Sequence, residues 1–169
     1  MGFLNRLFGG KEKQVPEVEK RTMRNLRVKD FVTYDLADYE VVGKIHYDDH
    51  GYTWDAYQLT SGGKSKWLSV EMDDELEVGM YEKFRIPGLE PGAKQITHDG
   101  KTYHLEEQGR AYVTSQGRSE NVNGAEMDYY EYLDDAGETY LSVEVWGGEV
   151  EVSKGYKIEE YEITILAAS

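Results

Sequence analysis

The sequence predicts an all-β fold, and two observations support that prediction. From residue 26 onward the chain is a series of short runs such as FVTYDL, YEVVGKIHY and TYLSVEV, in which β-branched or aromatic residues alternate with polar ones. Turn sequences such as DDHG, TSGG and DDAG separate these runs. This period of two, punctuated by Gly and Asp, is typical of antiparallel strands. Fourteen tyrosines and only three prolines also favour sheet.

An internal repeat refines the prediction. WLSVE at 67–71 returns as YLSVE at 140–144, and Asp55 precedes Leu68 by the same thirteen residues that separate Asp128 from Leu141. Matches at a fixed spacing predict two copies of one antiparallel β-meander.

The repeat sets the expected domain organisation. We expect a first β repeat at 26–88 and a second at 93–169, joined by PGLEPG at 87–92. Two such units would form either a pair of SH3-like small barrels or one composite barrel or sandwich. Each half is too small to bury a large core alone, so we expect the halves to depend on each other.

Residues 1–10, MGFLNRLFGG, predict a short amphipathic helix that ends at Gly9-Gly10. The basic segment at 11–25 predicts a flexible linker. On one interpretation the apolar face of the helix docks at a membrane or on a membrane-protein partner while basic side chains meet anionic lipid. On the other, the helix caps the barrel or binds a partner helix. The residues expected to dock are Phe3, Leu4, Arg6, Leu7, Phe8, Lys11 and Lys13.

Charge is distributed unevenly along the chain, which has a net charge of −14. Residues 1–29 contain eight basic and three acidic side chains, so the remaining 140 residues carry −19. A body this acidic repels the phosphate backbone, so nucleic-acid binding is disfavoured and cationic partners are favoured.

The chain has no cysteine, which removes disulfides, thiolate metal sites and cysteine nucleophiles and suits a reducing cytoplasm. No apolar run approaches the ~18–20 residues that span a bilayer, and the N-terminus lacks the apolar block of a secretory signal. We therefore expect a cytoplasmic protein, which is peripheral on the inner face of the membrane if residues 1–10 dock there.

The repeated hairpins predict which side chains share a face. A turn centred on Gly62-Gly63 pairs Tyr57 with Leu68 and Asp55 with Val70. In the second copy, a turn centred between Asp135 and Ala136 pairs Tyr130 with Leu141 and Asp128 with Val143. We expect the Tyr, Leu and Val side chains of both copies to point into the core, and each Asp to close a turn or accept backbone N–H bonds, because a buried carboxylate is costly without partners.

The opposite face of the two hairpins combines aromatic rings with carboxylates. Such a surface suits a polyamine-like cation, through ring faces and ion pairs. Alternatively, the rings form cross-strand pairs that stabilise an exposed sheet or the interface between the two halves. The candidate binding surface consists of Trp54, Trp67, Glu71, Tyr129, Tyr140 and Glu144.

Motifs for catalysis are weak. HYDDH contains His46 and His50 beside two carboxylates, but in a polar loop where solvated turn residues are the commoner explanation. EMDDELE lacks the ligand spacing of an EF-hand. No glycine-rich phosphate loop, Ser/His/Asp set or HExxH occurs. The sequence therefore predicts no catalytic residue, no metal site and no cofactor.

The residues of the first repeat also carry a family resemblance. Lys29-Asp30, Tyr39-Glu-Val41-Val-Gly43, Trp54-Asp-Ala-Tyr57 and Trp67-Leu68 are similar to motifs of the bacterial domain of unknown function 4178 family, over residues 26–85 and more weakly over 104–165. Lys29 stands where that family usually has glycine, and Ala56 where it usually has an acid. The resemblance implies no reaction. Members of that family are often encoded near small membrane proteins, envelope-stress proteins and polyamine-synthesis-like enzymes, so the resemblance implies a similar gene neighbourhood.

From these patterns we expect a non-catalytic adaptor, membrane-associated and related to envelope stress, that presents an acidic aromatic surface to a protein partner. The alternative is a small-ligand-binding β-barrel for a polyamine-like cation. A third hypothesis is a metal-dependent enzyme built on His46, His50 and nearby acids.

Overall fold

The structure is a computed structural model that describes residues 19–167. In this part of the chain the backbone forms eleven strands, all paired antiparallel, and two single-turn 3-10 helices, so the all-β prediction is confirmed. The strands are β1 (Phe31–Tyr34), β2 (Ala37–Asp49), β3 (Tyr52–Ser61), β4 (Lys64–Met72), β5 (Leu76–Phe84), β6 (Gln95–His98), β7 (Lys101–Gly117), β8 (Glu126–Asp134), β9 (Tyr140–Trp146), β10 (Glu149–Ile158) and β11 (Thr164–Leu166). The 3-10 turns are η1 (Glu120–Val122) and η2 (Glu160–Glu162).

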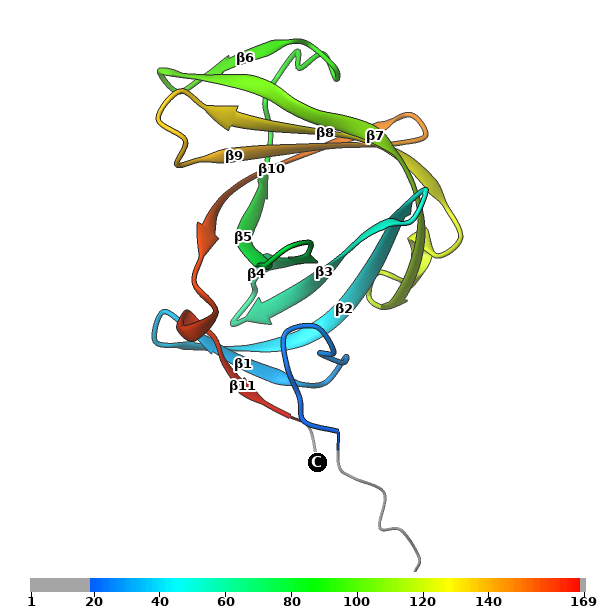
Figure 1. Cartoon of the computed structure of the whole chain (residues 1–169), viewed down its shortest axis with the longest axis vertical. Coiled ribbons are helices and arrows are strands. Elements are labelled where there is room, and N and C mark those ends of the chain that lie inside the picture. Colours follow the sequence, from blue (N-terminus) through cyan, green and yellow to red (C-terminus); the bar gives the residue numbers. More distant parts are fainter. Residues whose placement is uncertain (1–18, 168–169) are drawn as a thin grey trace, which may run out of the picture.

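Eight of these strands close into one barrel. Their order is β2-β3-β4-β5-β10-β9-β8-β7, and β2 pairs with β7 to complete the ring (Figure 1). Of the two arrangements that the sequence left open, the chain adopts the composite barrel. The remaining strands lie outside it: β1 pairs with the first residues of β2 and with β11, whereas β6 pairs with the first residues of β7.

Both halves contribute the same series of strands. Each begins with a four-residue strand, β1 or β6, followed by a long strand, β2 or β7, and then by three further strands. The two series also pair with each other, β2 with β7 and β5 with β10. The PGLEPG segment at 87–92 lies between β5 and β6, where the sequence placed the join.

The predicted core residues of the first hairpin are buried in an apolar cluster, but this cluster lies outside the barrel. Tyr57, Leu68 and Val70 point away from the barrel interior, which is lined by the face that was expected to point outward. They are still buried, because β1, β11 and the segment before β1 cover them, with Met23 and Leu26 in the same apolar cluster. Sequence alternation separates two faces without saying which one a barrel encloses.

A second apolar cluster covers the outer face of β8, β9 and β10. It contains Tyr132, Leu141 and Val143, packed against Ile96 of β6 and the segment between β5 and β6. The barrel therefore has an apolar cluster on each of two outer sides. A third cluster, which includes Ile45, Val113 and Met127, packs against the aromatic side chains of the interior, where the acidic residues also lie.

The first hairpin has the predicted register, with Tyr57 opposite Leu68 and Asp55 opposite Val70. The prediction for the second hairpin is wrong by two residues, because Tyr130 lies opposite Val143 and Tyr132 opposite Leu141. The cause is a longer turn: the Asp134 carboxylate accepts hydrogen bonds from the backbone N–H groups of Glu138 and Thr139, at 2.8 and 3.2 Å.

The N-terminal predictions fall mostly on residues that the structure does not describe. The helix expected at 1–10 and the docking residues Phe3, Leu4, Arg6, Leu7, Phe8, Lys11 and Lys13 all lie outside residues 19–167. Part of the segment expected to be a linker, within residues 19–25, contacts the folded body. Met23 is buried, and Arg21 pairs with the fully buried Asp30 at 2.7 Å. Within the described residues no helix has the length and apolarity to span a membrane.

Candidate ligand-binding cavity

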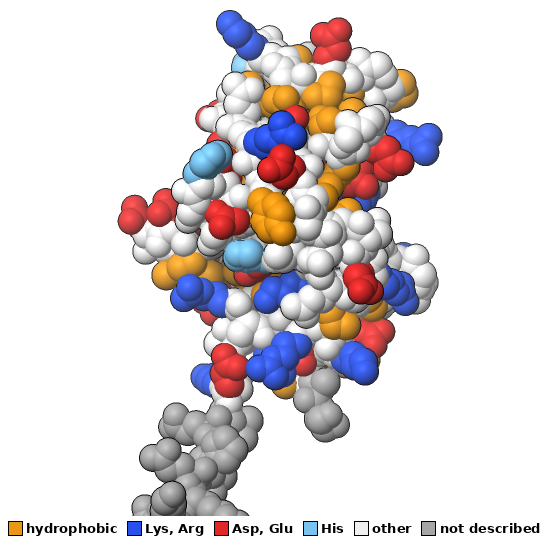
Figure 2. Space-filling view, turned by 90° about the vertical axis from the view of Figure 1, so that its right-hand side faces the viewer, with side chains coloured by type: hydrophobic (Ala, Val, Ile, Leu, Met, Phe, Trp, Pro, Cys, Tyr) orange, Lys and Arg blue, Asp and Glu red, His pale blue; other side chains and the backbone are white. Residues whose placement is uncertain are grey.

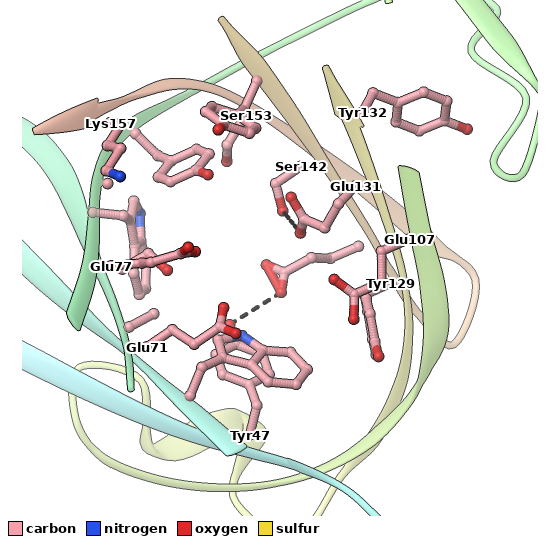
Figure 3. A pocket seen from close by; sticks show the side chains of 18 of the residues that line it. Tyr47, Glu71, Glu77, Glu107, Tyr129, Glu131, Tyr132, Ser142, Ser153 and Lys157 are labelled. Atoms are coloured by element: carbon pink, nitrogen blue, oxygen red, sulfur yellow. Dashed lines mark hydrogen bonds between the residues drawn. The ribbon is translucent and has the colours of Figure 1, made fainter. Parts of the chain in front are cut away.

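The interior of the barrel contains a cavity of about 270 Å³. An eight-stranded barrel is wide enough to hold one small ligand. Figure 3 shows side chains from several strands pointing into this space. Its wall includes Tyr47, Tyr52, Trp54, Trp67, Glu71, Glu77, Tyr81, Glu106, Glu107, Tyr129, Glu131, Tyr140, Ser142, Glu144 and Lys157.

All six residues of the predicted binding surface line this one cavity. Trp54, Trp67 and Glu71 reach it from β3 and β4. Tyr129, Tyr140 and Glu144 reach it from β8 and β9. Neighbouring strands of an antiparallel barrel bring the equivalent faces of the two hairpins to the same interior. The set therefore lines one partly open cavity inside the barrel rather than an outward-facing surface.

The cavity is strongly acidic. Six glutamates line it, whereas Lys157 is the one basic side chain on its wall in the described part of the chain. The acids differ in exposure. Glu77, Glu106 and Glu107 are exposed, whereas Glu71, Glu131 and Glu144 are half-buried.

Two deep carboxylates have raised pKa values. Burial raises the pKa of Glu131 to about 8, against a hydrogen bond of 2.8 Å from Ser142 Oγ that favours the ionised form, and neighbouring carboxylates raise it further. Burial likewise raises the pKa of Glu144 to about 7, against a hydrogen bond of 3.0 Å from Tyr47 Oη. A carboxyl group in a pocket with like charges favours its neutral form. Both acids therefore titrate near neutral pH.

Two further acids of the cavity have pKa values raised in the same direction. Burial raises the pKa of Glu71, which accepts a hydrogen bond from the Tyr52 hydroxyl. Burial also raises the pKa of Glu107, and Glu71 adds to the effect through charge repulsion. Perturbed acids gathered in one cavity are a feature of functional sites.

Aromatic side chains fill the wall between β2, β3 and β8. Tyr47 stacks on Trp54 with centroids 4.9 Å apart, and Tyr129 meets the Trp54 ring edge-on at 5.0 Å. Tyr129 also donates a hydrogen bond of 2.6 Å to Asp49. These contacts fix the rings, so this part of the wall is preorganised.

A hydrogen bond crosses the interior. Tyr47 belongs to β2 and Glu144 to β9, which are not neighbours in the barrel, yet the Tyr47 hydroxyl donates a hydrogen bond of 3.0 Å to the Glu144 carboxylate. A second cavity of about 190 Å³ lies beyond this bridge and shares Tyr47, Trp67 and Glu144 with the first. Because these three side chains line both cavities, they form a septum between them. The cavity of about 270 Å³ is called the first chamber, and that of about 190 Å³ the second chamber.

The second chamber differs in charge from the first. Lys83 and Arg118 line it together with Glu144 and Glu151. The Lys83 ammonium lies 4.7 Å from the centre of the Trp67 ring and pairs with Glu151 at 3.1 Å. A lysine thus occupies a site made from an aromatic face and a carboxylate, which is the combination that also lines the first chamber.

The histidines expected as metal candidates are separately paired. His46 Nδ1 bonds to Asp55 at 2.7 Å, and His50 Nδ1 bonds to Asp49 at 2.6 Å. Among residues 19–167 no group of three or more His, Asp and Glu side chains has the arrangement of a metal site. The two aspartates that were expected to close turns or accept backbone N–H bonds have side-chain partners. Asp55 is paired with His46, and Asp128 lies 4.0 Å from Arg110.

Sequence reasoning missed several acids of the cavity. Glu131 could have been identified from the sequence, because residues 129 and 131 share a strand face and Glu131 lies opposite Ser142 on the neighbouring strand. Glu106 and Glu107 could not have been identified in this way, because a β-bulge between Leu105 and Glu107 shifts the alternation and lets consecutive residues line the cavity.

The chain belongs to a protein family. A family model described as "Domain of unknown function (DUF4178)" matches residues 27–160 in one span that includes both halves of the barrel. The similar relatives include the uncharacterized proteins Mb2628 of Mycobacterium bovis and Rv2597 of Mycobacterium tuberculosis. Each is 32% identical over 145 residues, which cover 81% of this chain and 69% of the relative. No solved structure matches.

One departure from the family pattern now has a structural context. Lys29, which stands where the family usually has glycine, has a φ of 83°. Glycine adopts this left-handed conformation without steric cost, whereas a side chain is strained there. Its backbone N–H bonds to the Val41 carbonyl at 2.8 Å, which holds the turn against β2.

Proposed function

We propose that the barrel binds a small organic cation, of the polyamine class, in its first chamber. The observation that carries the proposal is the composition of the chamber wall, which has six glutamates and Lys157 as its one basic side chain in the described part of the chain. Ammonium groups balance such a wall through ion pairs, and the carboxylates accept their hydrogen bonds.

The aromatic side chains favour an organic cation over a hydrated metal ion. Trp67 and Tyr81 present apolar ring surface to the alkyl part of an amine, and ring faces attract ammonium groups. Lys83 on the Trp67 ring is an example of such a contact within this protein. Metal ions instead require several oxygen ligands converging on one point.

Binding would be coupled to protons. Near pH 7 the Glu131 carboxyl, with a pKa of about 8, is mostly protonated, and Glu144, with a pKa of about 7, is about half protonated. A bound ammonium favours the ionised form of both, so binding releases protons and affinity rises with pH up to about 8.

Calorimetric titration with spermidine at low ionic strength tests this proposal. We expect the wild-type protein to bind with a heat that depends on the ionisation enthalpy of the buffer. We expect the Glu131→Gln/Glu144→Gln double variant to bind at least about tenfold more weakly, a loss of ~1.4 kcal/mol or more.

The matched control is the Glu126→Gln/Glu138→Gln double variant, which makes the same two substitutions at exposed positions outside the cavity wall. It should bind like the wild type. An absence of heat at millimolar spermidine, or an equal loss of affinity in both double variants, would contradict cation binding in the barrel.

We also infer that the two halves arose as copies of one unit. The equal strand series of β1–β5 and β6–β10, and the pairing of corresponding strands, support this inference. On this view the two copies together form one cavity, and neither half encloses it alone.

The adaptor hypothesis remains a prediction from the sequence. Its docking residues, from Phe3 to Lys13, lie outside the described residues, whereas the acidic aromatic surface that it would present to a partner consists of residues that line the cavity.

A further inference from the structure

We propose that Lys83 limits the length of the ligand, so that the barrel selects short linear diamines and triamines over longer polyamines. The inference deepens the proposed function and rests on it. Lys83 would act as a specificity-determining residue from the second chamber, on the far side of the septum formed by Tyr47, Trp67 and Glu144.

The distribution of acids favours a linear ligand with two or more ammonium groups. Glu131 and Glu144 lie deep in the first chamber, whereas Glu77 and Glu106 are exposed on its wall. Aromatic rings line the wall together with these two groups of acids (Figure 3). A single compact ammonium ion reaches one acidic group, while an alkyl diamine reaches both and lays its carbon chain along the rings.

Lys83 supplies a positive charge beyond the septum. Its ammonium lies over Trp67 at 4.7 Å and pairs with Glu151 at 3.1 Å, and its charge acts on Glu144. Two acids of the second chamber are thereby partly neutralised. A ligand long enough to pass the septum would bring another ammonium toward Lys83, and like charges at close range repel.

Removing this charge should open the second chamber to a cation. Without the Lys83 ammonium, Glu144 and Glu151 would face Arg118 as the remaining cation among the described residues that line the chamber. The free ring face of Trp67 would then be available to the terminal ammonium of a longer ligand.

The experiment compares butylamine, 1,4-diaminobutane, spermidine and spermine by calorimetry on the wild-type protein and the Lys83→Met variant. Methionine keeps much of the side-chain length and removes the charge. We expect the wild type to bind the diamine at least about tenfold more tightly than the monoamine, and Lys83→Met to improve spermine binding by about tenfold with little change for the diamine.

The control is Lys64→Met, which removes the same charge from an exposed residue next to the Gly62-Gly63 turn. An equal gain in Lys64→Met would mean that only net charge matters and would overturn the role of Lys83. Equal affinities of the monoamine and the diamine, or equal gains for all amines in Lys83→Met, would overturn length selection while leaving cation binding intact. If no amine binds the wild type, the proposed function itself fails.

Discussion

Burial of Glu131 makes the stability of the protein depend on pH. Its pKa is about 8 in the folded chain, whereas an exposed glutamate has a value near 4.5. Between these values the unfolded chain is ionised while the folded chain retains the proton. Raising the pH through this range therefore favours unfolding, so the stabilising effect of the neutral group is complete below about pH 4.5 and is lost by about pH 8.

The Glu131→Gln variant should remove this dependence in buffers without added amine. Glutamine stays neutral and can still bond to Ser142, so we expect the variant to gain stability over the wild type as the pH rises from 5 to 8. The gain should be about 1–3 kcal/mol, since the Glu131 side chain is only half-buried and solvent screening reduces the full effect. Urea unfolding at several pH values measures it. Parallel pH profiles for wild type and variant would contradict the assignment, and Glu138→Gln serves as the exposed control.

Strand β5 depends on two glycines that make room for Tyr81. The Tyr81 ring lies across Gly155 of β10, its partner in the register, and a Cβ added at Gly155 would overlap the ring. A Cβ added at Gly79 would lie 2.7 Å from the same ring. An aromatic ring that covers a glycine on the next strand fixes both the register and the position of the cavity wall.

We therefore expect Gly155→Ala to destabilise the protein by about 1–3 kcal/mol, because the Tyr81 ring must move in a packed wall. Chemical denaturation followed by tryptophan fluorescence measures the loss. Gly148→Ala is the matched control, since nothing lies within 4 Å of an added Cβ at this turn position. Equal losses in the two variants would show that overlap with the Tyr81 ring is not the cause of the destabilisation.

The strands themselves were largely predictable, but their environment was not. Period-two alternation identified β3, β4 and β9 and the correct register of the Gly62-Gly63 hairpin. The register of the second hairpin depended on the carboxylate of Asp134, whose backbone bonds lengthen the turn. The choice of interior depended on β1, β6 and β11, because these short strands cover the Leu68 and Leu141 faces and leave the aromatic face to the cavity.

The candidate site was predictable as a set of side chains and not as a cavity. Trp67, Glu71 and Glu144 were found because the repeat marks them. Their convergence depends on closure between β2 and β7, which brings together strands far apart in the sequence. A pattern within one hairpin carries no information about that pairing.

The charge of the whole molecule separates a basic N-terminal part from an acidic body. Residues 1–29 carry a net +5 against −19 for the rest of the chain. Figure 2 shows several Lys and Arg side chains near the end from which the described chain starts, with acidic groups more widely spread. A protein with this asymmetry would approach an anionic membrane with its N-terminal end.

Deletion of residues 1–10 tests that orientation. We expect the full chain to co-sediment with liposomes that contain anionic lipid and the deleted chain to remain largely in the supernatant, because both the apolar side chains and Arg6 are lost. Liposomes of neutral lipid are the control. Equal sedimentation of the two chains, or none of either, would contradict membrane docking through this segment.

The pairing of β2 with β7 and of β5 with β10 also affects how the chain folds while it is being synthesised on the ribosome. During translation β2 to β5 emerge well before β7 and β10, the partners of β2 and β5. Until then the nascent first half has two unpaired strand edges, and the cover that β11 completes over the Leu68 face is still unmade. Such edges are templates for association with other chains, and folding dominated by distant pairings is slow. The half-made barrel is therefore the stage at which a molecular chaperone would matter most.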